Sequence, residues 1–313
     1  MGVSREQFMA SVGAVDNFVQ KLVVDSYENH ASNDWSNELE QNPHGQPWHT
    51  SFHASSFPGD DPKACPRKSL YTMMGFPKDK KHSHRSISIM DAGKDIEARI
   101  VTMLHENGVL LSNPPWHEHQ TGFEDRDVWL TGSVDAIVLP PGWTSPHAIE
   151  VKTKSHEHVQ AMIDGQRSWD DPHRRQLLTY IAMLNMESKK LWPDLKPVRD
   201  GTILYVSRAE PSVMMEYYFE LDEAFFDEGK RKLAEWRDMF MEGVIPPRPK
   251  DWKWTDLPCK WCDHKKHTCK PDDKQKIEML MESHGRAWAE NVYGEYDGKA
   301  VRDSVLERWQ RDG

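Results

Sequence analysis

Two neighbouring β-strand patterns carry the charged residues that most restrict what this chain can fold into. The first, Thr131-Gly-Ser-Val-Asp-Ala-Ile-Val-Leu139, is mainly apolar and ends at the turn sequence Pro140-Pro-Gly142. The second, Ala148-Ile-Glu-Val-Lys-Thr153, follows Ser145-Pro146. Short apolar runs bounded by turn residues predict two strands of one sheet.

Three charged side chains lie on these strands, and their spacing suggests a site. Glu150 and Lys152 are two positions apart, so in a strand they point to the same face. Together with Asp135 they offer two carboxylates for a hard cation, Mg²⁺ or Mn²⁺, and an ammonium beside it for a water or phosphate oxygen. Phosphodiester hydrolysis requires this chemistry. A Glu-x-Lys triplet alone is more often a surface ion pair, so the flanking sequence has to support the catalytic interpretation.

Two helices are predicted on either side of the strands. Upstream, Gly93-Lys-Asp-Ile-Glu97 opens a predicted helix. Downstream, Asp171-Pro172 begins another, since proline is favourable at a first helical position. Gln176 and Tyr180 are i and i+4 on that helix and therefore share a face.

In this order the motifs resemble those of the PD-(D/E)XK nuclease superfamily, above all its RecB-like branch, over roughly residues 60 to 270. The resemblance implies an α/β fold with a central mixed β-sheet flanked by helices, a restriction-endonuclease-like core. It also implies that Asp135 and Glu150 ligate the metal, assisted by the Val151 carbonyl, and that Lys152 orients the attacking water.

The resemblance assigns further roles to three residues. Gln176 and Tyr180 would position the substrate strand near the metal. Glu97 stands where the family usually has histidine, and would complete the coordination sphere or bind a second ion. Carboxylate oxygen suits Mg²⁺ and Mn²⁺ better than imidazole does, so this departure does not exclude activity but can shift the metal preference.

The four cysteines form a second candidate site. Cys259, Cys262 and Cys269 stand as C-x2-C-x6-C, and Cys65 lies far upstream. A charged N-terminus without an apolar signal segment disfavours disulfides. Structural zinc remains an alternative, because Cys-x2-Cys is also a zinc spacing and His264 and His267 lie between the cysteines.

The placement of the four cysteines resembles the iron-sulfur nucleases of the CRISPR-associated Cas-four type and the AddB type. That resemblance implies a [4Fe–4S] cluster held by four thiolates, which joins helical N- and C-terminal regions around the nuclease core.

Composition limits the classes of partner. The chain has 313 residues, a mean hydropathy of −0.78 and a net charge of −10. No apolar run is long enough to span a membrane, so a cytoplasmic protein is expected, in the host cytoplasm if viral. The negative charge disfavours a broad nucleic-acid-coating surface. Local basic clusters occur at 78–85, 173–175 and 264–267, and the first is the best candidate to contact phosphates.

Three regions are expected: an N-terminal helix and polar loop (1–62), the nuclease core with Cys65 (63–250), and the cysteine cluster with C-terminal helices (251–313). Helices are predicted at 4–29, after Cys65-Pro66, and at 90–107, 172–187, 222–242 and in 272–313. Strands are predicted at 109–112, 127–131, 133–139, 147–153, 201–207 and 213–220.

These features predict a metal-dependent deoxyribonuclease, an exonuclease of DNA processing or recombination. Its substrate would be DNA that is single-stranded or has free ends, and its partner a recombination or CRISPR-adaptation protein. Two other classes stay open. One is a nuclease-fold protein that binds nucleic acid as an adaptor with weak or no activity. The other is a zinc-stabilised interaction protein in which the Glu-x-Lys triplet is accidental.

Overall fold

The computed structural model describes residues 51–73, 84–114, 121–249, 252–253, 255, 259–265 and 269. The chain divides into two compact units, residues 1–41 with 80–91, and residues 42–79 with 92–313. In the first unit the described residues are 84–91, the first turns of helix α4 (His84–Glu106). The predicted helices at 4–29 and 272–313 lie outside the described residues, as does most of the loop predicted at 30–62.

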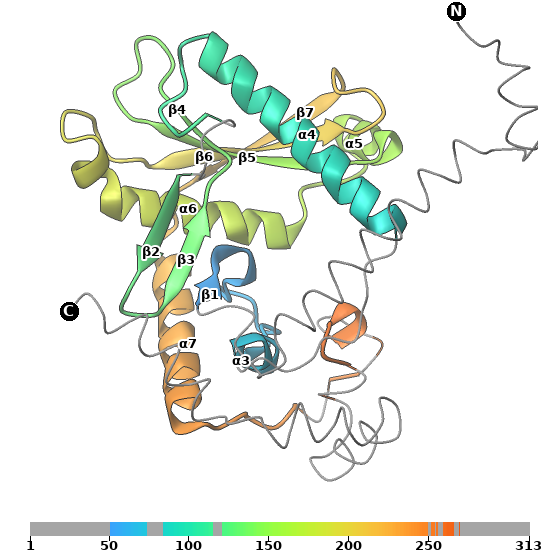
Figure 1. Cartoon of the computed structure of the whole chain (residues 1–313), viewed down its shortest axis with the longest axis vertical. Coiled ribbons are helices and arrows are strands. Elements are labelled where there is room, and N and C mark those ends of the chain that lie inside the picture. Colours follow the sequence, from blue (N-terminus) through green and yellow to red (C-terminus); the bar gives the residue numbers. More distant parts are fainter. Residues whose placement is uncertain are drawn as a thin grey trace, which may run out of the picture. The chain divides into compact units, whose positions relative to one another are not determined.

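A mixed four-stranded sheet forms the centre of the second unit, in the order β4-β5-β6-β7 (Figure 1). Its strands are β4 (Ala136–Val138), β5 (His147–Lys154), β6 (Asp200–Ser207) and β7 (Met214–Glu220). The two central strands run parallel, and each edge strand is antiparallel to its neighbour. Ala148, Val151 and Ile203 of the two central strands are buried, as expected for strands covered on both faces.

A smaller sheet lies beside it, in the order β1-β3-β2. Its strands are β1 (Phe52–His53), β2 (Gly122–Asp125) and β3 (Leu130–Ser133). β1 is parallel to β3, and β2 is antiparallel to it. Mixed sheets with flanking helices confirm the predicted α/β class.

Helices cover both faces of the four-stranded sheet (Figure 1). The remaining described helices are α3 (Pro66–Met73), α5 (His156–Ile163), α6 (Asp171–Leu191) and α7 (Glu223–Glu242), with 3₁₀ turns η1 (Ala54–Ser56) and η2 (Cys259–Trp261). α6 packs on one face and buries Leu177, Ile181 and Leu184. From Ala92 onward, α4 lies against the other face.

Gly93 explains how α4 approaches the sheet so closely. A Cβ atom at this position would stand 3.1 Å from Oγ1 of Thr153 on β5. Glycine weakens a helix interior, so its presence there has a packing reason. Because α4 begins at His84, Gly93 lies within the helix, whereas the sequence predicted that Gly93 opens a helix.

The predicted strand over 133–139 was wrong in one informative respect. The chain leaves β3 at Ser133, bends at Asp135 and enters the larger sheet at Ala136. A continuous apolar run reads the same whichever sheet buries it, so the pattern could not show the change of sheet.

Several other element predictions differ from the structure. The strand predicted at 127–131 is a turn at 126–129 followed by β3, and the strand at 109–112 is one bridge between Leu110 and Val138. Residues 51–57 were expected in a polar loop, yet Phe52 and Phe57 are buried in the core. Helix α5 was not predicted. Among the described helices, none is both long enough and apolar enough to cross a membrane.

Candidate functional site

The bend between β3 and β4 places Asp135 against the edge of β5. Backbone pairing of β4 with β5 ends at Ile149, so the edge of β5 beyond that residue has no strand partner on this side among the described residues. There the backbone N–H of Val151 donates to Oδ2 of Asp135 across 2.7 Å. The N–H and C=O groups of a strand residue point to the same edge, so the Val151 carbonyl faces the side that Asp135 occupies.

Glu150 is the most buried acid of the site, with 1% of its surface exposed. Its Oε1 accepts a hydrogen bond from Nζ of Lys152. Its Oε2 is buried without a hydrogen-bond partner among the described residues. A buried carboxylate oxygen in that state is costly unless a cation or water satisfies it.

Burial is also the main cause of an altered pKa at Glu150. Loss of solvent raises the pKa well above its usual range, and the charges of Asp135 and Glu97 raise it further, while Lys152 opposes them. Burial likewise raises the pKa of Asp135, against the lowering effects of Lys152 and the Val151 N–H. Each carboxylate thus disfavours the charge of the other in the absence of a cation.

Lys152 keeps its charge despite being largely buried. Burial favours the neutral amine, but the carboxylates of Glu150 and Asp135 outweigh that effect and raise the pKa of Lys152. About a quarter of the side chain, 23%, remains exposed. The site therefore holds a fixed ammonium that is still accessible to a ligand.

Helix α4 contributes Glu97 to the same site. Its charge acts on Glu150, Lys152 and Tyr180, which places the carboxylate within electrostatic reach of all three. Glu97 therefore acts electrostatically on the strand acids from a different element.

Helix α6 contributes the Gln176–Tyr180 pair. Nε2 of Gln176 donates to the Tyr180 hydroxyl at 2.7 Å. The tyrosine ring is buried edge-on against Phe123. Burial, followed by the negative charge of Glu150, raises the pKa of Tyr180, so the phenol stays protonated.

The acid site fits a hard divalent cation by the chemistry of its donors. The Oε2 of Glu150, the Asp135 carboxylate and the Val151 carbonyl are all oxygen donors, which hard cations prefer. Within the described part of the chain, however, no three His, Cys, Asp or Glu side chains are already grouped to hold a metal ion.

A polar network that the sequence did not reveal continues along the same face of β5. Nζ of Lys154 lies 2.5 Å from Oδ2 of Asp170, and the hydroxyl of Tyr205 lies 3.0 Å from Nδ1 of His173. Burial and the charges of Lys154 and Lys152 lower the pKa of His173 to about 4. Period-two spacing from Lys152 was the one sequence signal for Lys154.

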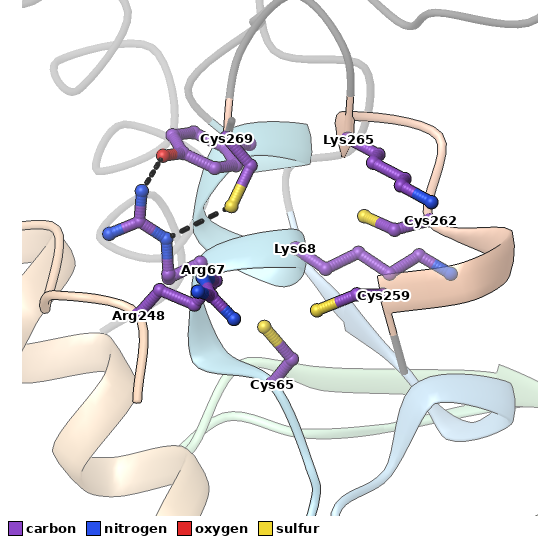
Figure 2. A pocket seen from close by; sticks show the side chains of 9 residues that line it. Cys65, Arg67, Lys68, Arg248, Cys259, Cys262, Lys265 and Cys269 are labelled. Carbon is purple, nitrogen blue, oxygen red and sulfur yellow. Dashed lines mark hydrogen bonds between the residues drawn. The ribbon is translucent and has the colours of Figure 1, made fainter. Parts of the chain in front are cut away.

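The four cysteines line one pocket, although they come from distant segments. Figure 2 shows their sulfur atoms pointing into the same space. All four are free thiols, so none forms a disulfide. The pocket is lined by Cys65, Arg67, Lys68, Tyr71, Arg248, Cys259, Cys262, Lys265 and Cys269.

The electrostatics of this pocket combine thiols with cations. Burial and the neighbouring thiols raise the pKa of Cys65, and burial raises that of Cys262 to about 11. At Cys259, burial and Cys269 raise the pKa, and Arg248 partly offsets them. Four thiols can serve as ligands of a metal or cluster that displaces their protons. Among the described residues, however, the cysteines are not among any group of three or more side chains placed to hold a metal ion.

His264, one histidine of the zinc alternative, is directed elsewhere. Its Nε2 lies 3.2 Å from Oγ1 of Thr72, and its ring packs on Tyr71. It does not line the cysteine pocket, whereas His267 lies outside the described residues.

The basic clusters are only partly described. Most of the cluster at 78–85 lies outside the described residues. In the second cluster, Arg174 and Arg175 form ion pairs with Asp60 and Asp61 at 3.4 and 3.2 Å.

Comparisons with known proteins found matches among solved structures. No protein-family model and no curated protein matches the chain. The alkaline exonuclease LHK-Exo from Laribacter hongkongensis superposes with a TM-score of 0.37 at 14% identity, over 62% of this chain and 89% of that chain. The structure of LHK-Exo in complex with dAMP gives a TM-score of 0.41 at 14% identity, over 63% and 90%. Similarity of this degree does not by itself assign an activity.

Proposed function

We propose that the protein is a metal-dependent deoxyribonuclease that hydrolyses phosphodiester bonds, acting as an exonuclease on DNA that is single-stranded or has free ends. The observation that carries the proposal is the buried Oε2 of Glu150, which has no partner among the described residues and lies beside Asp135 and Lys152. A protein gains no stability from such an arrangement, so a ligand is the simplest reason for it.

Asp135, Glu150 and the Val151 carbonyl would hold Mg²⁺ or Mn²⁺, with Glu97 completing the sphere or binding a second ion. The bound cation would supply a nucleophilic water and neutralise negative charge on the phosphate. The Val151 N–H fixes the orientation of the Asp135 carboxylate through its 2.7 Å hydrogen bond. The acids are therefore preorganised for a cation before it binds.

Lys152 would stabilise the negative charge that develops on the phosphate oxygens. Its ammonium is fixed by Glu150 and stays partly exposed, so it can donate a hydrogen bond without reorganisation. The Gln176 amide, held against the Tyr180 hydroxyl, would position the substrate strand beside it.

The cysteine pocket would hold a [4Fe–4S] cluster, with Cys65, Cys259, Cys262 and Cys269 as ligands. Support comes from four sulfur atoms that face one space and from the cysteine order shared with the iron-sulfur nucleases. The cluster would tie α3 to the segment after α7 and act structurally. A reducing cytoplasm would keep the four thiols available.

Digestion of end-labelled single- and double-stranded DNA with Mg²⁺, Mn²⁺ or EDTA tests the activity. We expect stepwise shortening from an end with either metal and none with EDTA. Binding of DNA without cleavage in any metal would instead favour the adaptor alternative. Iron and acid-labile sulfide, measured against zinc on the protein purified without oxygen, test the cluster separately.

A further inference from the structure

Arg67 is a buried arginine on α3 that contacts the cysteine pocket. Only 9% of its surface is exposed. Its Nε donates to Sγ of Cys269 across 3.4 Å, and its Nη2 donates to the Tyr71 hydroxyl at 2.5 Å (Figure 2). A third donor, Nη1, bonds the carbonyl of Pro246.

The three acceptors belong to different parts of the chain. Tyr71 is on α3 itself, Pro246 follows α7, and Cys269 lies 202 positions from Arg67. A guanidinium presents its N–H donors in a rigid planar fork. The three hydrogen bonds therefore hold Tyr71, Pro246 and Cys269 in fixed positions relative to one another. The Cys269 sulfur is therefore held at a set position relative to Cys65, which lies two residues before Arg67.

Arg248 also lines the pocket, and its side chain hydrogen-bonds the thiol of Cys259 and lowers the pKa of that thiol. Lys68 also lines the pocket, but its side chain is exposed and makes no hydrogen bond to a sulfur atom among the described residues. It contributes charge, which water screens. Arg67 contributes a buried, directed N–H···S contact, and such contacts set the reduction potential of iron-sulfur clusters.

We propose that Arg67 is a positioning residue for the cysteine pocket, which places Cys269 for the cluster and raises the cluster's reduction potential through the Nε–H···Sγ hydrogen bond. The bond withdraws electron density from the ligand sulfur and so stabilises the reduced, more negative state. This inference rests on the cluster of the proposed function, and goes beyond it by predicting a redox property and the residue that sets it.

Two substitutions of Arg67 and two controls test the inference in the full-length protein purified without oxygen. Arg67→Lys keeps the positive charge but loses the planar fork, and Arg67→Gln removes the charge as well. Lys68→Ala removes a charge from the same pocket. Tyr71→Phe removes a hydroxyl that Arg67 bonds, while leaving the sulfur contact in place.

The readouts are iron and sulfide per chain, the midpoint potential from a redox titration followed by electron paramagnetic resonance, and the Fe–S(Cys) stretching frequencies. We expect Arg67→Lys to have a more negative midpoint potential, higher stretching frequencies and less iron than the parent. Lys68→Ala and Tyr71→Phe should shift the potential less than Arg67→Lys does, because both keep the hydrogen bond from Arg67 to Cys269, although Tyr71→Phe should unfold more readily. In Arg67→Gln, the fall in midpoint potential and the rise in stretching frequencies should be at least as large as in Arg67→Lys.

Two results would overturn the inference, and they are distinguishable. In the first, the parent carries iron and sulfide, and Arg67→Lys has the same midpoint potential, stretching frequencies and iron content as the parent. Arg67 then has no role at the cluster, and the cluster assignment stands. A parent that carries no iron or sulfide removes the cluster and this inference together, while the acid site is tested separately by DNA digestion. If Arg67→Gln does not fold, Arg67→Lys and the vibrational frequencies still decide the question.

Discussion

The backbone N–H of Val151 donates to the carboxylate of Asp135 at the point where strand β4 stops pairing with β5. A side chain thus occupies a position that a neighbouring strand would otherwise fill. The short length of β4 is therefore part of the site, because a longer β4 would cover the edge to which the Asp135 carboxylate and the Val151 carbonyl are directed.

Replacing either strand acid should abolish cleavage without unfolding the protein. In EDTA, Asp135→Ala and Glu150→Ala should melt at or above the temperature of the parent, since each removes one of two mutually repelling buried carboxylates. The rise in melting temperature that Mn²⁺ causes in the parent should be lost. Glu216→Ala, an exposed acid on β7 of the same sheet, is the matched control. Retained cleavage, or Mn²⁺ stabilisation equal to the parent's, would contradict the ligand assignment.

Lys152→Ala should lower the rate of cleavage by about 100-fold or more, the usual effect of losing one preorganised electrostatic donor. The circular dichroism spectrum and binding of Mn²⁺ should remain close to those of the parent. Lys190→Ala, at a lysine of α6 that is 81% exposed, should behave like the parent. A rate within threefold of the parent would remove Lys152 from the mechanism.

Tyr180→Phe should separate the role of the Tyr180 hydroxyl in positioning the substrate from the role of the ring in core packing. The substitution removes only the hydroxyl that accepts the Gln176 N–H, and the ring can still pack on Phe123. We expect a stability loss of about 1 kcal/mol, the usual value for one hydrogen bond, and a fall in cleavage of about 10-fold. Gln176→Ala should reduce cleavage similarly. If both variants cleave DNA at the parent rate, the pair has only a structural role.

Loss of Cys65 should be as damaging as loss of Cys262. Each should lower iron content, solubility and melting temperature, and reduce nuclease activity as a consequence. The reason is that Cys65 closes a long loop onto the cysteine segment, and opening a long loop enlarges the unfolded ensemble. A colourless protein with one zinc per chain, unchanged after Cys65→Ser, would show that the pocket has no iron-sulfur role.

The stability of the protein on the acid side should depend on His173. The folded protein lowers its pKa from the usual value near 6.5 to about 4. Between these values the unfolded chain binds the proton more tightly, so this histidine makes stability fall as the pH drops below about 6.5. From pH 7 to pH 5 the loss is on the order of 2 kcal/mol.

His173→Gln removes that titration and can still bond the Tyr205 hydroxyl. Urea unfolding of parent and variant at pH 7 and pH 5 measures the difference. The variant should lose less stability than the parent over this interval. Equal losses would show that the histidine is not held neutral in the folded protein.

Local sequence pattern was enough to define most strands and helices of the core. Glu150 and Lys152 share a face because strand side chains alternate, and this holds wherever the strand packs. The helix of Gln176 and Tyr180 was readable from Asp171-Pro172 and from helical spacing. These features depend on neighbouring residues alone.

Contacts between distant residues were decided only in the tertiary structure. The apolar run after Thr131 could not show that the chain changes sheets at Asp135, because burial in either sheet requires the same residues. Phe52 and Phe57 lie in a polar stretch, and their burial depends on α7 and β3.

The cysteine pocket shows the same division most clearly. Spacing in the sequence identified Cys259, Cys262 and Cys269 as a group, since short-range spacing alone allows such a group to converge on one ligand. The position of Cys65 beside them, and the bond from Arg67 to Cys269, depend on how α3 packs against a segment 202 positions away. No local periodicity encodes that packing, because its free energy comes from burial shared among elements that meet only in the folded chain.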